Sequence, residues 1–214
     1  MNLILHYAPV ACSLVPYVTL TEANAPFEVR PVNMGKRQQM TADYLKINPK
    51  HKVPVLVIDG EPLSENVAIQ QWIHRNYPAA KLLPADPMKE LKAISLMAWC
   101  ASGIHPYLGI YNTPTRVCDL AGSEETVKRC SAKMVYETFK IADEMLAGRE
   151  WFFDHFTAPD AHFFWCFRRG VQLKLDTLQF KNCTAHFERM QKRPSVQKVL
   201  AFEKETQAAF AAAA

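Results

Sequence analysis

With 214 residues, of which 49% are hydrophobic and 21% charged, the chain has a globular composition and enough length for two modest domains. Its formal net charge of +4 is small and evenly spread, which argues against a nucleic-acid-binding protein. No stretch of about 18 uninterrupted apolar residues is present, so we expect no membrane span, and the N-terminus lacks the charged segment of a secretory signal.

The first 77 residues alternate between strand and helix patterns. A β-branched run at 53–58 is followed by Asp59-Gly60, a dipeptide that favours a tight hairpin turn. The predicted order is β-α-β-α-β-β-α. The expected strands are 2–6, 27–32, 53–58 and 62–64, and the expected helices are 13–24, 38–47 and 65–77.

A proline-rich stretch separates this half from the rest, with prolines at 78, 84 and 87. Beyond it the patterns are helical, over roughly 88–112, 124–147, 157–173, 183–192 and 195–209. We therefore predict an α/β domain at 1–79, a linker at 80–87 and an all-helical domain at 88–214.

Cysteine usage indicates a reducing compartment. The six cysteines include no C-x-x-C pair, and cysteines and histidines form no ligand cluster in sequence, so we expect neither a disulfide framework nor a metal site. The expected location is the cytoplasm, and the thiols are expected to be mostly buried and inert. Cys12 is the exception, because it lies where the first strand turns into a helix.

A thiol at a helix N-terminus faces unpaired backbone N–H groups and the positive end of the helix dipole. Both stabilise a thiolate, belonging either to Cys12 or to a ligand. Lowering a thiol pKa from about 8.5 to about 6.5 requires roughly 3 kcal/mol, which a helix start and one charge-assisted hydrogen bond can supply. The helix start at Cys12, with help from Ser13 or His105, is therefore sufficient in magnitude to stabilise a thiolate, and the sequence leaves open whether Cys12 or the ligand supplies it.

Pro54 lies inside a strand pattern, where a proline cannot donate to the ladder. Either the strand is at a sheet edge, or Pro54 is a cis turn at which a loop ends and the strand begins. Because only about 5–6% of X–Pro bonds are cis, the sequence by itself favours trans. If cis, Val53 would offer its backbone to a peptide-like ligand.

Ser64-Glu65-Asn66 precedes the next helix and allows two interpretations. Ser64 is a favourable N-cap, with Glu65 in the first turn. Alternatively, the helix start binds a carboxylate and Glu65 binds an amine, which together recognise an α-amino-acid group. Further along, Thr157 and Asp160 form a variant capping box, which we assign to folding.

These pieces together resemble the glutathione transferase superfamily over nearly the whole chain. A cysteine at the first helix and Ser102-Gly103-Ile104-His105 narrow the resemblance to the bacterial beta class. The other motifs that carry it are the β-α-β-α-β-β-α order, Asn48-Pro49-Lys50, Val53-Pro54-Val55-Leu56, Ser64-Glu65-Asn66-Val67-Ala68-Ile69 and Phe156-Thr157-Ala158-Pro159-Asp160-Ala161.

The resemblance implies a thioredoxin-like first domain that binds glutathione, with a helical second domain that carries the hydrophobic-substrate site. It implies that Val53 pairs with the cysteinyl backbone, with Pro54 cis, and that Glu65 and Asn66 hold the γ-glutamyl end. Lys36 or Arg37 would reach the glycyl carboxylate. His105 matches the active-site histidine of the class, and the residues expected around the second substrate are Tyr107, Tyr111, Trp165 and Arg169.

Four residues depart from the class pattern. Val10 and His51 stand where glycine is usual, Ala98 replaces an asparagine that reaches the neighbouring subunit's glutathione, and Arg169 stands near a usual tryptophan. The last two motivate an alternative function, a non-catalytic binding or regulatory protein of the same fold.

The expected activity is conjugation of the glutathione thiol to small hydrophobic electrophiles, as in detoxification. A second activity is also expected, in which Cys12 acts as a monothiol disulfide reductase or peroxidase. Glutathione is a co-substrate here, and no other cofactor is expected. The resemblance also implies a homodimer.

Overall fold

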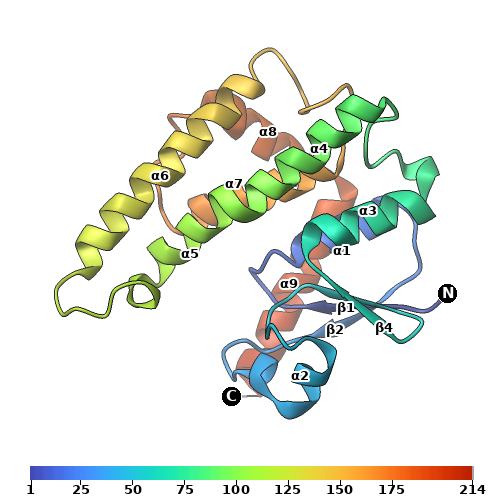
Figure 1. The fold of residues 1–214 in the computed structure, drawn as a ribbon, viewed down its shortest axis with the longest axis horizontal. Coiled ribbons are helices and arrows are strands. Elements are labelled where there is room, and N and C mark those ends of the chain that lie inside the picture. Colours follow the sequence, from blue (N-terminus) through green and yellow to red (C-terminus); the bar gives the residue numbers. More distant parts are fainter. Residues whose placement is uncertain (214) are drawn as a thin grey trace. The chain divides into compact units, whose positions relative to one another are not determined.

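The computed structural model describes residues 1–213, which fall into two compact units (Figure 1). Of the described residues, unit 1 comprises 1–83 and 192–213, and unit 2 comprises 84–191. The last helix, α9 (Pro194–Ala212), therefore belongs to the unit that contains the sheet. The division into domains at 1–79 and 88–214 remains a prediction. It did not anticipate that α9 groups with the sheet.

Unit 1 contains a four-stranded mixed sheet in the order β2-β1-β3-β4. Strand β1 is parallel to β2 and antiparallel to β3, and β3 forms a hairpin with β4 through the predicted Asp59-Gly60 turn. The strands are β1 (Leu3–Tyr7), β2 (Glu28–Pro31), β3 (Val55–Ile58) and β4 (Glu61–Ser64), and the helices besides α9 are α1 (Leu14–Glu22), α2 (Ala42–Ile47) and α3 (Asn66–Asn76). The expected thioredoxin-like element order is confirmed.

Helix α9 packs against α1 in unit 1. Phe202 of α9 meets Tyr7 and Tyr17, with ring centroids 5.6 and 5.5 Å apart. Arg193 donates to Glu22 at the end of α1, at 2.8 Å. Aromatic burial is the larger of these contributions, because a partly exposed ion pair adds little.

Unit 2 consists of helices joined by turns and loops, and residues 84–191 contain no strand. Its helices are α4 (Pro87–Trp99), α5 (His105–Asn112), α6 (Glu124–Met145), α7 (Ala158–Gln172) and α8 (Lys181–Gln191). The predicted helix 88–112 is interrupted, because a π-helical segment at Cys100–Ile104 joins α4 to α5. The core contains tilted and edge-on phenylalanine rings from α6 and α7, including Phe139, Phe163 and Phe167.

The capping box predicted at α7 is confirmed. The Thr157 N–H donates to Asp160 Oδ2 at 2.8 Å, and the same carboxylate accepts from the Phe152 N–H at 3.1 Å. His186 of α8 also contacts it at 3.1 Å. Asp160 therefore joins α7, α8 and the preceding loop, which is a structural role.

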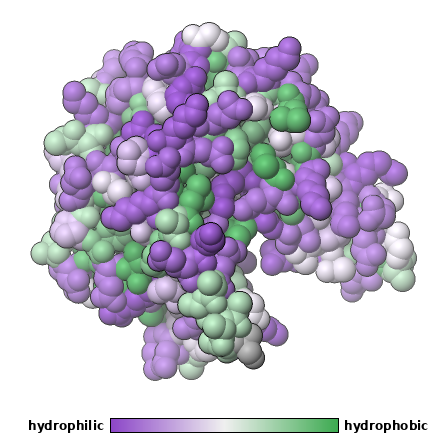
Figure 2. All heavy atoms as spheres, turned by 180° about the vertical axis from the view of Figure 1, so that it is seen from behind, coloured by the Kyte–Doolittle hydropathy of each residue, from purple (hydrophilic) through white to green (hydrophobic). Residues whose placement is uncertain are grey.

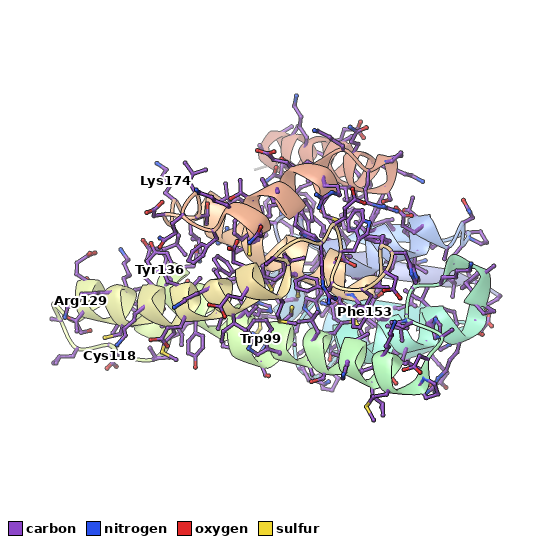
Figure 3. The ribbon with its side chains drawn as sticks, turned by 90° about the horizontal axis from the view of Figure 1, so that it is seen from above. Trp99, Cys118, Arg129, Tyr136, Phe153 and Lys174 are labelled. Atoms are coloured by element: carbon purple, nitrogen blue, oxygen red, sulfur yellow. The ribbon has the colours of Figure 1, made fainter. Side chains whose placement is uncertain are left out.

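A cavity of about 600 Å³ lies in unit 2, and its lining residues include Trp99 and Phe153, which are labelled in Figure 3. The face of the molecule drawn in Figure 2 is mainly hydrophilic, with hydrophobic side chains in small patches. Within residues 1–213, no helix is both long enough and apolar enough to cross a membrane.

Candidate functional site

Cys12 lies in the turn before α1, where its side chain is only 8% exposed. Its thiol donates to the Val53 carbonyl, with 3.6 Å between sulfur and oxygen. Burial, with a smaller contribution from the Glu65 carboxylate, raises the pKa of this thiol to about 12, although the local backbone, Asn66 and Lys52 act in the opposite direction. Desolvation outweighs the favourable effect of the helix start at Cys12, which leaves a ligand thiol as the better source of a thiolate.

The loop before β3 is held so that the Val53 carbonyl faces the Cys12 thiol. The Lys52 carbonyl accepts from Tyr44 Oη at 2.7 Å and from Asn48 Nδ2 at 2.9 Å. The Val53–Pro54 bond is cis, as the resemblance implies, so the trans form favoured by frequency alone is wrong. Pro54 precedes β3, an internal strand, which resolves the alternatives in favour of a turn that ends the loop.

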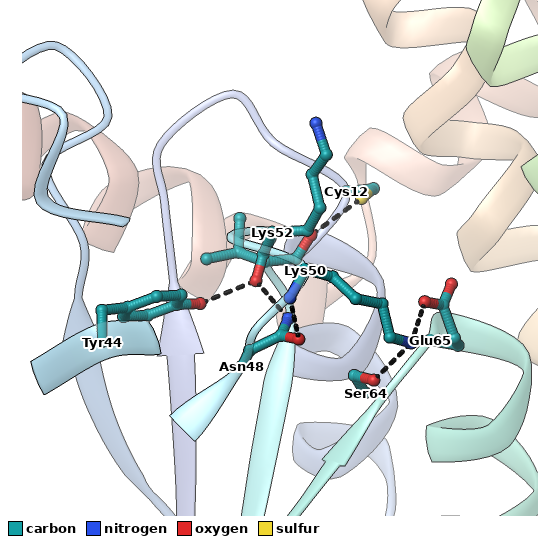
Figure 4. A network of polar contacts seen from close by, with 8 residues as sticks. Cys12, Tyr44, Asn48, Lys50, Lys52, Ser64 and Glu65 are labelled. Atoms are coloured by element: carbon teal, nitrogen blue, oxygen red, sulfur yellow. Dashed lines mark hydrogen bonds and ion pairs between the residues drawn. The ribbon is translucent and has the colours of Figure 1, made fainter. Parts of the chain in front are cut away.

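Glu65 begins α3 in an unusual backbone conformation, with φ 73°. Such a φ costs on the order of 1–3 kcal/mol for a residue other than glycine, and strain of this kind concentrates at binding sites. Lys50 Nζ donates to Glu65 at 2.6 Å and to Ser64 Oγ at 2.9 Å (Figure 4). The predicted Ser64 cap is wrong: Ser64 ends β4, and Glu65 occupies the N-cap position.

Asn66 connects α3 to the Cys12 turn. Its Nδ2 donates to the Cys12 carbonyl at 3.1 Å. Its Oδ1 is buried and has no hydrogen-bond partner within residues 1–213, which is costly unless a ligand or water donates to it. Cys12, Val53, Glu65 and Asn66 are thus gathered in unit 1 as expected, whereas their roles remain predictions.

The other glutathione-site candidates in unit 1 have different partners. The Ser13 hydroxyl donates to the Ala8 carbonyl at 3.1 Å and accepts from the Ala8 N–H at 3.0 Å, so it closes the turn. Lys36 donates to the Ala213 carbonyl beyond α9. Arg37 is exposed, with a left-handed φ of 56°.

Both residues that replace the usual glycines keep a glycine-like conformation, with φ 67° at Val10 and 47° at His51. A β-branched residue is a marked outlier there. The Val10 N–H donates to Glu203 of α9 at 2.7 Å, and Tyr7 Oη donates to the same oxygen at 3.1 Å. The buried Glu203 carboxylate thus helps to hold the loop that leads to Cys12.

In unit 2, His105 and Trp165 lie together, with ring centroids 4.3 Å apart. One turn after Trp165 on α7, Arg169 donates to Asn112 at the end of α5. Tyr107 and Tyr111 are four residues apart and share one face of α5. His105 and Asn112, which are seven residues apart, share the opposite face. The predicted substrate residues are therefore distributed over two faces.

Sequence reasoning missed the polar framework of the loop. Tyr44, Lys50 and Lys52 were not singled out, although Asn48-Pro49-Lys50 was part of the motif. The side chain of Asn48 and the hydroxyl of Tyr44 converge on one carbonyl, which a sequence pattern does not reveal. Among residues 1–213, no group of three or more His, Cys, Asp or Glu side chains is placed to hold a metal ion.

The family model for the N-terminal domain of glutathione S-transferase matches residues 3–75. The glutathione S-transferase GstA of Escherichia coli O157:H7 is 30% identical over 204 residues, covering 93% of this chain and 98% of that protein.

Two solved structures are similar over 94% of this chain and 98% of theirs, each with 29% identity and a TM-score of 0.82. One is a sphingomonad glutathione S-transferase complexed with glutathione, and the other is a bacterial beta-class enzyme from Sphingomonas chungbukensis. Their match spans the sheet unit and the helical unit alike. The chain belongs to the glutathione S-transferase family, and a bacterial beta-class member is among the structures it resembles over nearly its whole length.

Proposed function

We propose that this protein transfers the glutathione thiol to small electrophiles, with glutathione lying along the groove of Cys12, Val53 and Glu65. The observation that carries the proposal is the contact of the Cys12 thiol with the Val53 carbonyl, at 3.6 Å, beside the strained backbone of Glu65 at the start of α3. There Glu65 binds the glutathione amine and Asn66 Oδ1 accepts a donor from the ligand. Arg37 is the stronger candidate for the glycyl carboxylate, because Lys36 already donates to Ala213.

The proposed nucleophile is the sulfur of glutathione. A thiol with a pKa of about 12 is almost wholly protonated at neutral pH, so Cys12 acts as an S–H group. In the reaction a sulfur–carbon bond forms, the leaving group departs with its electron pair, and the thiol proton passes to solvent. The proposed catalytic role of His105 is to help stabilise the thiolate. Monothiol reductase or peroxidase chemistry at Cys12 is proposed as a secondary activity.

Substitution of Cys12 separates these activities. We expect Cys12→Ala to retain conjugation within a few-fold and to lose glutathione-dependent disulfide reductase activity. The matched control is Cys130→Ala, which removes an exposed thiol on α6. Both variants are assayed for conjugation and for disulfide reduction. If Cys12→Ala folds but loses conjugation while Cys130→Ala retains it, glutathione sulfur is not the independent nucleophile proposed here.

Calorimetry with glutathione distinguishes the alternative, a binding or regulatory protein. Tight binding without turnover on a panel of electrophiles favours that alternative. If the protein does not bind glutathione, both functions are excluded.

We also propose a homodimer, a cytoplasmic location and a role in detoxification. All six cysteines are free, which is consistent with a reducing compartment. Cell fractionation tests the location, and the dimer is taken up in the Discussion.

A further inference from the structure

Arg169 brings a positive charge to the α7 face that holds the candidate second-substrate residues. It follows Trp165 by four residues, so the two side chains leave the helix on the same side. Trp165 packs against His105, and Arg169 reaches the C-terminal end of α5. The guanidinium therefore lies at the opposite end of α5 from His105, about two helical turns along that helix, and on the side of α7 that carries Trp165.

Within residues 1–213, no acidic group pairs with this charge. Arg169 Nη2 donates to Asn112 Oδ1 at 2.6 Å, and Nη1 lies 3.4 Å from Gln172 Oε1. Both acceptors are neutral amides, and within residues 1–213 no carboxylate forms an ion pair with Arg169. Burial and the adjacent Arg168 both lower the pKa of Arg169, which is the direction expected for a partly buried cation without an acidic partner.

The side-chain amides of Asn112 and Gln172 hold the guanidinium in place but leave some of its N–H donors available. Arginine has five N–H donors in a planar fork, and two of them are used here. The remaining three can bind a planar carboxylate through two parallel hydrogen bonds. Because the group is already partly desolvated and held in place, a carboxylate gains more from this contact than it would from a mobile surface arginine.

We propose that Arg169 determines specificity by binding a carboxylate on the second substrate, so that the preferred electrophiles are aromatic or unsaturated carboxylates. This inference rests on the proposed transferase function and refines its substrate class. Glutathione supplies the nucleophile as before, and Arg169 makes no bond to a reacting atom. Its contribution is therefore expected mainly in KM and less in kcat.

The test uses two electrophiles that react by the same aromatic substitution, 1-chloro-2,4-dinitrobenzene and 4-chloro-3,5-dinitrobenzoate. Each kcat/KM is divided by the uncatalysed rate constant with glutathione. We expect Arg169→Gln to lower the value for the benzoate by about 10- to 100-fold, the range for a lost charged hydrogen bond, and to change the neutral substrate by less than about 3-fold. Arg169→Lys should retain part of the preference, since it keeps the charge without the fork.

Arg168→Gln is the matched control, because it removes the same charge from the next position of the same helix. It should leave the ratio between the two substrates unchanged. Equal effects of the two arginine variants would reduce the role of Arg169 to a general field effect and overturn the proposal. An equal loss on both substrates in Arg169→Gln would also overturn it, because it would show a structural role.

A binding measurement keeps the inference separate from the catalytic proposal. Calorimetry with 3,5-dinitrobenzoate, which has no leaving group, should show weaker binding to Arg169→Gln than to the unmodified protein or to Arg168→Gln. 1,3-Dinitrobenzene, which lacks the carboxylate, should bind all three alike. If neither chlorinated substrate is turned over but only Arg169→Gln binds dinitrobenzoate more weakly, the transferase function is rejected and the carboxylate site is retained. If all three proteins bind dinitrobenzoate equally, the carboxylate site is rejected.

Discussion

At the scale of single residues, His162 has the least ordinary environment in the helical unit. Its side chain is fully buried in α7, and within residues 1–213 neither ring nitrogen has a hydrogen-bond partner. Burial, followed by the influence of His105, lowers the pKa of His162 to about 3. The folded protein therefore holds this ring neutral at pH values where the unfolded chain protonates it.

This difference makes the stability depend on pH. Because the pKa is lower in the folded state than the ordinary 6.5, stability is lost as pH falls from about 6.5 toward 3. Between pH 7.5 and pH 5, we expect His162 to cost about 2 kcal/mol of the free energy of unfolding. Urea denaturation at pH 7.5 and at pH 5 measures this difference in the free energy of unfolding.

Two variants check that assignment. His162→Phe should lose this part of the pH dependence, whatever its stability at pH 7.5. His51→Gln, at an exposed position, should keep it. An unchanged pH dependence in His162→Phe would show that other groups cause it.

Cys12 shows how far residue-level reasoning extends. Its position before a helix was evident from the sequence, and the favourable effect of a helix start is at most about 2 kcal/mol. Raising a thiol pKa from 9.0 to about 12 corresponds to about 4 kcal/mol in the opposite direction. Burial decides the sign, and burial depends on neighbours that spacing along the chain does not disclose.

At the scale of elements, the π-helical segment between α4 and α5 is the clearest departure from the sequence pattern. Pro106 cannot donate to the helix, and its ring would crowd the carbonyl four residues earlier in a continuous helix. Gly103 gives the Trp99 indole room, because a β-carbon there would lie 2.6 Å from Trp99 Cδ1. The apolar periodicity of 88–112 was correctly taken as helical, but it does not distinguish α from π turns.

Gly103→Ala should therefore be destabilising, although alanine usually stabilises a helix. We expect a loss of about 1–3 kcal/mol in the free energy of unfolding, as for other overpacked sites. Gly109→Ala in α5 is the control, since its β-carbon would meet nothing within 4 Å, and a gain of up to about 1 kcal/mol is expected.

A second substitution identifies the cause. In a Trp99→Leu background, Gly103→Ala should lose its penalty, because the clash is with the indole. Chemical denaturation of the four proteins completes this double-mutant cycle. Additive effects would mean that the crowding lies elsewhere.

Other elements could be predicted because local signals agreed. Asp59-Gly60 and the valine-rich run fixed the β3–β4 hairpin, and Thr157 and Asp160 marked the start of α7. The start of α3 was assigned wrongly, because Ser64 is a good cap in isolation but pairs in β4 with Val55. The cis bond at Pro54 came only from the resemblance, since frequency favours trans.

At the scale of the whole molecule, the proposed homodimer needs an apolar contact surface. Large apolar side chains are exposed on two helices of unit 2: Met88 and Leu91 of α4, and Ile141 and Met145 of α6. Ile141 and Met145 also line the 600 Å³ cavity. Exposed apolar side chains gathered in this way are typical of association sites.

We expect Leu91→Glu to separate the subunits, because a charge in an apolar interface must be desolvated. Light scattering should then report half the mass of the unmodified protein. Leu178→Glu, at a residue that is 77% exposed outside these helices, should leave the mass unchanged. A monomeric unmodified protein, or a dimer that tolerates Leu91→Glu, would contradict this surface.

The position of Glu203 has a consequence for the order of folding during synthesis. The carboxylate that holds Val10 and Tyr7 is 193 residues beyond Val10 in the chain, and all of unit 2 lies between them. Domains that emerge first usually fold first. Here the sheet emerges first, but Glu203 emerges after all of unit 2, so a complete helical unit is synthesised before the loop at Cys12 can make this contact.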